Sequence, residues 1–409
     1  MAIRISTQTM YDRNVQQLSN LQGNMLRTQM QLSTMQRVLT PADDPVASAR
    51  ALEVTQAYEM NEQFTVNRQT AESSLLQVDT TLGTLSDIME AALESVVAAG
   101  NPGQVQSDRD AVALALEGHL NDMLSQANTA DGSGGYLFSG YKTNTQPFAL
   151  TADGATYYGD QGRRELQVGS GRQMPISASG SEIFEQIPTG NGTFLTGADR
   201  SNTGTGIISP GTVTGATQPV NYEINFTKDA TSGLVQFSVT NTDDGSEVMP
   251  ATDFKAGEPI TFGGMSFNIA GAPAGGDRFT IEPSRNQSVF TSIRDVIKAL
   301  REPASSSGPA AAAALTNALS QANQNLQNAQ VNIASVQASV GTRRLELDTL
   351  ESSASALKIQ YSDQITNLIG LTEAGQIEAV SRFQQQTTSL TAAQQTFRSA
   401  TQLSLFNYI

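Results

Sequence analysis

The 409-residue sequence predicts a mainly α-helical protein with an inserted β region: the N- and C-terminal segments form an antiparallel bundle of long helices, and the centre forms a β-rich domain. Of the 34 glycines, 5 precede residue 131, 25 lie between residues 131 and 285, and 4 follow, so the helix-breaking residues concentrate in the centre. Apolar residues recur at spacings of three and four in both ends, as on one face of a helix. In the centre, apolar and polar residues alternate, as in strands with one solvated face.

The first predicted element is a helix within residues 1–44. Its apolar residues follow one seam, with Thr28 in the single gap: Leu18, Leu21, Met25, Leu32, Met35 and Leu39. Thr40 is followed by Pro41 and, three residues after the threonine, by Asp43, which is a capping pattern. We therefore expect one helix to end near Leu39 and the next to begin directly after it.

Residues 45–134 are expected to form the N-terminal part of a helical rod. A second seam runs along Ala71, Leu75, Val78, Leu82, Leu85, Met89, Leu93 and Val96. The Asn-Pro-Gly sequence at residues 101–103 breaks this helix, and Ser107 begins another.

The centre divides into residues 135–188, a region of β-hairpins and short strands, and residues 189–285, an outer β-rich insertion. Short strands and a turn are predicted at 135–140 and 156–160, and clearer strands at 222–227, 235–239 and 279–281. Residues 189–218 consist mostly of Gly, Thr, Ser and Asn, so we expect mobile loop there rather than core.

Residues 286–370 are expected to form the C-terminal part of the rod, and residues 371–409 a final helix. The rod seam comprises Leu319, Ala322, Leu326, Ala329, Ile333, Val336, Val340, Arg343, Leu347, Leu350, Ala354, Leu357, Tyr361, Gln364 and Leu368. A helix of that length spans roughly 75 Å at about 1.5 Å per residue. Such a helix needs a partner alongside, and the N-terminal helices are the natural one.

The composition excludes most chemistry, so we expect no enzyme, no cofactor and no metal site. The net charge of −15 repels nucleic acid, and the chain has no Cys and one histidine, His119. The pairs Asp43-Asp44 and Asp243-Asp244 are explained by a helix cap and by a turn. The longest apolar run has six residues, too short for a membrane span. The N-terminal residues lack the apolar region and cleavage site of a secretory signal peptide, so the chain is expected either to stay inside the cell or to leave by another route.

The two terminal segments carry narrow apolar seams diluted by Gln, Asn, Ser and Thr. These seams bury too little area to offset the entropy of ordering in isolation, so the segments are expected to order against neighbouring subunits. The predicted assembly interface comprises Leu18, Leu21, Met25, Leu32, Met35, Val380, Phe383, Leu390, Phe397, Leu403 and Phe406.

Several stretches resemble the flagellin family. RVLTPADDP at residues 37–45 is similar to that family's signature between its first and second helices. The stretch GYLFSGYKTNTQPF at 135–148 is followed by YYGD at 157–160, GSEIF at 180–184 and the closing QLSLFNYI at 402–409. This series resembles the hook-associated members of the family. The resemblance covers both ends and residues 135–184, and leaves residues 189–276 unassigned.

The resemblance implies a structural subunit of the bacterial flagellum, placed at the junction between hook and filament. It implies export through the flagellar type III apparatus without a cleaved signal peptide, an extracellular location and no membrane insertion. The implied partners are further copies of the chain in a ring or tube, another hook-associated protein on the hook side, flagellin on the filament side, and an export chaperone at the C-terminal segment.

Two alternatives remain open. The chain could be a filament flagellin, which shares the helical ends but would not be expected to carry the 135–140 and 157–160 stretches. It could also be a secreted adhesin or enzyme whose active part is the central β domain, although that domain shows no clustered acid, base or nucleophile.

Overall fold

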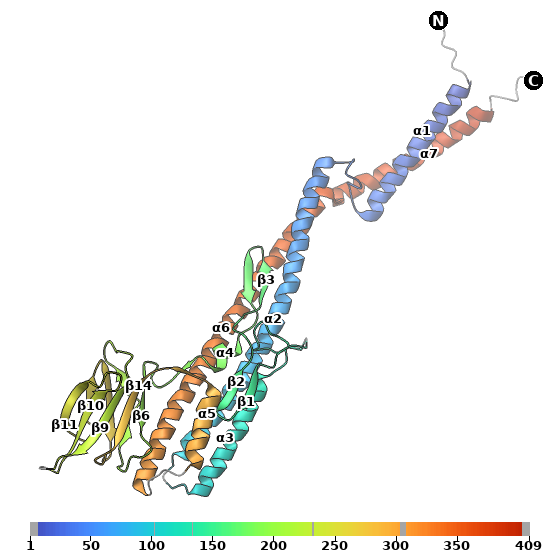
Figure 1. Ribbon diagram of the computed structural model, residues 1–409. Coiled ribbons are helices and arrows are strands. Elements are labelled where there is room, and N and C mark those ends of the chain that lie inside the picture. The colour runs from blue at the N-terminus through green and yellow to red at the C-terminus, as the bar shows by residue number, and fades with distance from the viewer. Residues whose placement is uncertain (1–6, 102, 133, 231–232, 303–307, 403–409) are drawn as a thin grey trace, which may run out of the picture. The chain divides into compact units, whose positions relative to one another are not determined.

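The computed structural model describes residues 7–101, 103–132, 134–230, 233–302 and 308–402 (Figure 1). It is mainly α-helical with an inserted β region, as the sequence predicts. The chain forms two compact units, and each is described by itself. Unit 1 comprises residues 1–68 and 348–409, and unit 2 comprises residues 69–347.

Unit 1 is built from helices at both ends of the chain: α1 (Thr7–Thr34), the beginning of α2 (Pro45–Ala99), the end of α6 (Pro309–Ile369), and α7 (Glu373–Gln402). Helices α1 and α7 lie side by side (Figure 1). The ring of Tyr11, near the start of α1, packs at a tilt against the ring of Phe397, near the end of α7. The Met35 carbonyl, just after α1, accepts the N–H of Leu371, just before α7. The pair is therefore antiparallel.

The connection between α1 and α2 differs from the sequence prediction. Helix α1 ends at Thr34 rather than near Leu39, because Met35 takes a left-handed backbone conformation. Helix α2 begins at Pro45, and its cap is Asp44, whose Oδ1 accepts the Ala47 N–H at 3.0 Å. Thr40 and Asp43 instead close a turn, in which the Asp43 N–H donates to the Thr40 carbonyl.

Unit 2 has a helical part composed of the remaining lengths of α2 and α6, together with α3 (Gln106–Ala127) and α5 (Val289–Arg301), which pack on each other. The predicted seam of α2 from Ala71 to Val96 is buried except for the half-buried Leu93. The α6 seam is likewise buried from Leu319 to Val340. Beyond this unit, the predicted seam residue Leu357 is exposed.

Short elements join the helices to the β domain: β1 (Phe148–Thr151), β2 (Gly154–Tyr157), β3 (Glu165–Gly169), β4 (Arg172–Pro175), α4 (Gly180–Phe184), β5 (Ile187–Pro188) and β15 (Asn286–Gln287). Strands β1 and β2 pair with each other, as do β3 with β4 and β5 with β15. The predicted strand at 135–140 is wrong: these residues form turns, with one bridge between Ala130 and Tyr136.

The stretches 135–148 and 157–160 fold together into one aromatic cluster. Phe148 packs its ring 4.9 Å from Tyr157, 5.2 Å from Phe184 and 5.1 Å from Phe290. The Tyr157 hydroxyl lies 2.9 Å from the Phe138 carbonyl oxygen and 2.7 Å from that of Asp160, and burial raises the pKa of Tyr157 to about 12. These turns therefore form around buried aromatic rings.

The β domain contains a five-stranded sheet in the order β11-β10-β9-β14-β6 (Figure 1). A second sheet has the order β12-β13-β7, with β8 also pairing β13. The strands are β6 (Phe194–Ala198), β7 (Ile207–Ile208), β8 (Thr212–Val213), β9 (Tyr222–Lys228), β10 (Val235–Asn241), β11 (Glu247–Asp253), β12 (Pro259–Phe262), β13 (Met265–Ala270) and β14 (Arg278–Pro283). The strands predicted at 222–227, 235–239 and 279–281 are confirmed.

The prediction of loop rather than core at residues 189–218 is wrong. Phe194 and Ile208 belong to the buried core between the two sheets. Two-residue strands such as β7 and β8 are too short to show alternation, so the polar composition around them concealed their apolar residues.

Candidate assembly surface

The inner faces of α1 and α7 bring together most of the predicted interface residues, but within one chain. Leu18, Leu21, Met25 and Leu32 are half-buried on α1, and Phe383 and Phe397 are half-buried on α7. Leu390 is buried, and the Tyr11 and Phe397 ring centroids are 5.3 Å apart. These side chains thus hold the helix pair together, although few of them are fully covered.

The remaining predicted interface residues lie elsewhere. Met35 and Val380 are exposed, and Met35 follows the end of α1 instead of continuing its seam. Leu403 and Phe406 lie outside the described residues.

A second apolar set on α1 was not identified from the sequence. Val15, Leu26 and Met30 are exposed, the last two by 53% and 52%. Spacings of eleven and four residues return a helix to nearly the same face, so these three residues share one side of α1. The sequence contains this signal, but the stronger seam at Leu18 to Leu32 obscured it. We call this set the outer α1 face.

The segment between α1 and α2 and the segment between α6 and α7 are joined by main-chain hydrogen bonds. Gln36 and Gly370 form an isolated antiparallel bridge, flanked by the Arg37 N–H bond to the Ile369 carbonyl and the Leu371 N–H bond to the Met35 carbonyl, each 2.8 Å long. We call residues 35–44 with 369–372 the joint. These bonds give the joint a defined conformation.

Charged side chains in the joint and on the adjoining part of α1 neutralise one another. Arg27 pairs with Asp43, and Arg37 pairs with Asp44 at 3.2 Å. The Thr40 N–H lowers the pKa of Asp43, and the Ala47 N–H lowers the pKa of Asp44. Both carboxylates are therefore ionised at neutral pH, and the predicted capping role of the Asp43-Asp44 pair belongs to Asp44.

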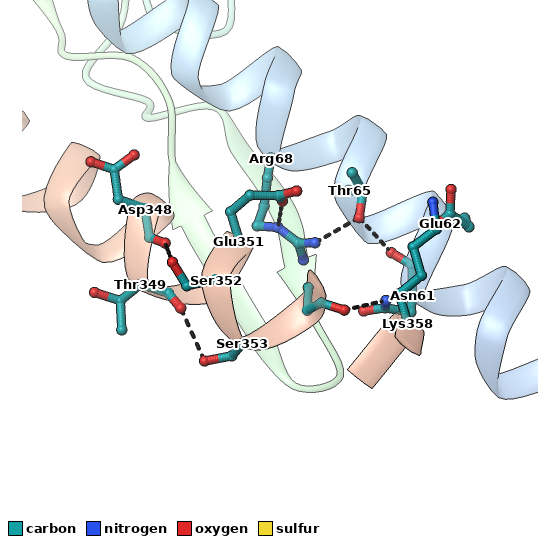
Figure 2. Close-up of polar contacts among 11 residues, drawn as sticks. Asn61, Glu62, Thr65, Arg68, Asp348, Thr349, Glu351, Ser352, Ser353 and Lys358 are labelled. Carbon is teal, nitrogen blue, oxygen red and sulfur yellow. Dashed lines mark hydrogen bonds and ion pairs between the residues drawn. The ribbon is translucent and has the colours of Figure 1, made fainter. Parts of the chain in front are cut away.

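Polar groups replace apolar ones between α2 and α6 in unit 1 (Figure 2). The buried Asn61 donates from Nδ2 to the Ala354 carbonyl at 3.0 Å. The buried Arg68 donates from Nε to Glu351 at 2.7 Å and from Nη2 to the Thr65 hydroxyl at 2.7 Å. We call Asn61, Thr65, Arg68 and Glu351 the polar clasp. A polar group in a helical seam fixes which residues face each other, so the clasp sets the register of this helix pair.

The described residues provide no catalytic arrangement. They contain no group of three or more His, Cys, Asp or Glu side chains that could hold a metal ion, and His119 is half-buried on α3. A cavity of about 190 Å³ in unit 2 is lined by Asp295, whose pKa is raised by burial, and by Ser292, whose hydroxyl donates to the Ser288 carbonyl. No histidine or lysine lines this cavity to activate that serine.

No helix within the described ranges has a stretch long and apolar enough to cross a lipid bilayer.

Comparison with known proteins agrees with this geometry. Residues 5–143 match the family described as the bacterial flagellin N-terminal helical region, and residues 198–283 match the D2-like domain of flagellar hook-associated protein 1. The antiparallel terminal helices, the inserted β domain and the first of these matches define the chain as a flagellin-type subunit.

Individual relatives identify the family within the class of flagellin-type subunits. The structure is similar to the crystal structure of flagellar hook-associated protein 3 from Legionella pneumophila, with a TM-score of 0.73 and 31% sequence identity. The similar region covers 77% of this chain and 98% of that one. A crystal structure of the flagellar junction protein of the same organism gives 31% identity and a TM-score of 0.72, covering 78% of this chain and 100% of that one. The chain belongs to the family of flagellar hook-associated protein 3.

The curated relatives are matched over part of their length. Flagellar hook-associated protein 3 of Salmonella typhimurium is 35% identical over 185 residues, which is 45% of this chain and 58% of the relative. The protein of that name from Escherichia coli is matched with the same identity over the same shares.

Proposed function

We propose that this chain is a structural subunit of the bacterial flagellum that forms the junction between hook and filament. Its terminal helices pack with those of neighbouring subunits. The observation that carries this proposal is the outer α1 face, which leaves Leu26 and Met30 about half exposed although the inner face of the same helix is already covered by α7. Exposed apolar side chains on one face of a helix are typical of interaction sites.

The charge distribution supports contact between copies through unit 1. Unit 1 holds nine Lys and Arg against eleven Asp and Glu, so its net charge is −2 and the remaining −13 falls on unit 2. Copies that meet through unit 1 therefore avoid most of the repulsion that a chain of net charge −15 would otherwise face.

The predicted interface residues take two roles in this proposal. Leu18, Leu21, Met25, Leu32, Phe383, Leu390 and Phe397 hold α1 on α7 and so present the outer α1 face. Met35 and Val380, which are exposed, contact neighbouring subunits directly. We propose the same assembly role for Leu403 and Phe406.

The proposed partners follow from position in the flagellum. They are further copies of this chain, another hook-associated protein on the hook side and flagellin on the filament side. An export chaperone binds the C-terminal segment, residues 371–409, before the chain is exported through the flagellar apparatus to the extracellular flagellum. The relatives named as junction and hook-associated proteins support this placement.

A deletion strain tests the proposal. Cells without this chain should keep their hooks, lose their filaments and release flagellin into the medium, and a plasmid copy should restore the filaments. Deletion cells with normal filaments would contradict the proposal. Counting copies per flagellum separates the junction role from that of a filament flagellin, because a junction needs far fewer copies than a filament.

A further inference from the structure

The cavity of about 190 Å³ in unit 2 is bordered by helices α5 and α6 and by the end of strand β6. Protein interiors contain few spaces larger than a water molecule, so one of this size needs a physical reason. The reason is that small side chains border it. Five of the residues that line the cavity are alanines: Ala198, Ala299, Ala314, Ala318 and Ala322.

One face of α6 supplies hydrogen-bond donors to the cavity. Ala314, Ala318, Gln321 and Asn325 follow one another at steps of four, three and four residues, so they lie on one side of the helix. Asn325 is 5% exposed, and its Oδ1 accepts the Gly190 N–H at 2.9 Å. Its Nδ2 makes no hydrogen bond to the residues that the structure describes, and neither does the side-chain amide of Gln321. A buried amide donor is costly without an acceptor, so this wall is suited to a ligand with acceptor atoms.

Helix α5 supplies hydrogen-bond acceptors to the same cavity. Ser292 is buried, and its hydroxyl donates to the Ser288 carbonyl at 3.2 Å, which leaves the hydroxyl oxygen able to accept. Three residues further along α5, Asp295 accepts the Gln287 Nε2 on its Oδ2 at 2.9 Å. A carboxylate oxygen accepts more than one hydrogen bond, so Asp295 retains accepting capacity toward the cavity. The cavity therefore combines donors from α6 with acceptors from α5.

The charges at the cavity favour an uncharged ligand. Arg200 lies at the open side, because its side chain is 57% exposed, and it forms an ion pair with Glu302 at 2.5 Å. The carboxylate of Asp295 disfavours an anion, and the guanidinium of Arg200 disfavours a cation. A ligand that suits both walls must donate and accept hydrogen bonds without a net charge.

We propose that this cavity binds an uncharged polyhydroxy compound of the size of a single sugar ring. Each hydroxyl group both donates and accepts, so neighbouring hydroxyls can bond to Asp295 and Ser292 on one side and to Gln321 and Asn325 on the other. Among the described residues that line the cavity none is aromatic, so binding rests on hydrogen bonds and is weak. The site belongs to unit 2 and does not involve the outer α1 face, so this inference is independent of the proposed assembly role.

Ligand-observed NMR titration of the full chain tests the proposal. The probes are D-glucose, D-galactose, N-acetyl-D-glucosamine and methyl α-D-galactoside, with acetate and choline as a charged pair. We expect saturable binding of at least one of the four sugars, with a Kd on the order of 1–10 mM, and no saturable binding of acetate or choline in that range. Failure of all four sugars to bind, or binding of acetate or choline as tight as that of the sugars, would overturn the inference.

Two variants locate the binding in the cavity. Ala318→Leu fills the space and should abolish binding, whereas Ala334→Leu, at an exposed position of the same helix, should bind as the wild type does. Gln321→Ala removes an amide that the fold does not use, so its thermal midpoint should be unchanged. Its affinity should fall about fivefold, as expected for the loss of one neutral hydrogen bond. Unchanged affinity in a folded Ala318→Leu or in Gln321→Ala would overturn the inference.

The same titrations distinguish two sources of the ligand. Equal affinity for D-galactose and its methyl glycoside would support the terminal ring of a glycan chain, because the glycoside is blocked where the chain would continue. Binding of free sugars alone would support a free sugar. Failure of the inference leaves the junction function intact, because the deletion strain tests that function separately.

Discussion

The Nε of Arg68 lies 2.7 Å from Oε2 of Glu351, although the arginine side chain is 5% exposed and the glutamate side chain is 43% exposed. The two partners therefore differ in what they lose when the pair is broken. Glu351 can return to water, whereas Arg68 would remain a buried charge. This asymmetry within the polar clasp leads to a first prediction.

Glu351→Ala should destabilise the protein more than Arg68→Met. Removing the carboxylate leaves the buried guanidinium without its ion pair, at a cost of about 2–4 kcal/mol. Methionine fills much of the volume of Arg68 and frees Glu351 to be solvated, so that variant should lose less than about 1 kcal/mol. Urea unfolding of the full chain measures both. Equal losses would show that the pair is not buried asymmetrically.

Asp44→Ala should loosen the start of α2, whereas Asp44→Asn should preserve it. Asparagine also caps helices, while alanine leaves the Ala47 N–H without its acceptor. Hydrogen exchange of the Ala47 amide reports the difference. Equal exchange rates in the two variants would contradict the assignment of this cap.

The cap of α2 should also respond to acid. Because the pKa of Asp44 is lowered in the folded protein, its contribution to stability is present above its ordinary value of 3.8 and is lost as the pH falls through the lowered value. The wild type should therefore show faster exchange of the Ala47 amide at low pH, and Asp44→Asn should lack that acid dependence.

Tyr157→Phe should destabilise unit 2, and Tyr158→Phe should not. The Tyr157 hydroxyl has one proton and lies within hydrogen-bond distance of the Phe138 and Asp160 carbonyl oxygens, so its removal takes away the one donor that they share, at a cost of about 1–2 kcal/mol. Tyr158 is exposed and is the matched control. Thermal unfolding compares the two, and similar midpoints would contradict the role of the hydroxyl.

Because the pKa of Tyr157 is raised, the stability of this aromatic cluster should fall at alkaline pH. The neutral phenol stabilises the fold below the ordinary pKa of 10.0, and this contribution is lost as the pH rises through about 12. Tyr157→Phe should weaken this alkaline dependence of unfolding, whereas Tyr158→Phe should retain it.

Substitution of the outer α1 face should impair assembly without affecting folding. The double variant Leu26→Gln with Met30→Gln changes two half-exposed side chains, so its free energy of unfolding should stay within about 0.5 kcal/mol of the wild type. Filament retention in the complemented strain should fall. Leu390→Gln is the contrasting control, because it buries a polar group between α1 and α7 and should destabilise unit 1 itself. Full filament retention by the double variant would contradict the assembly role.

The sequence was most informative where spacing and burial coincide. Leu75, Leu82 and Met89 are spaced as one helical face and are buried together, because a long regular helix exposes the same face to its partner throughout. The strands at 222–227 and 279–281 were predictable for the same reason with a period of two.

Prediction was less accurate where contacts between residues distant in sequence determine where a helix ends or what a buried polar side chain binds. No glycine in the sequence marks the end of α1 at Thr34. The left-handed conformation that ends the helix is taken by Met35, whose carbonyl is bonded to the N–H of Leu371. The polar clasp was missed because Asn61 and Arg68 interrupt an apolar pattern, and only the position of α6 shows what they bind.

Hydrogen exchange of α1 and α7 tests the central claim most directly, with the free chain compared against assembled flagella. Residues 7–34 and 373–402 should exchange rapidly in the free protein, because their shared seam is mostly half-buried, and at least tenfold more slowly once neighbouring subunits cover the outer α1 face. Equal, slow exchange in both states would contradict the account, since the terminal helices would then need no neighbour to become ordered.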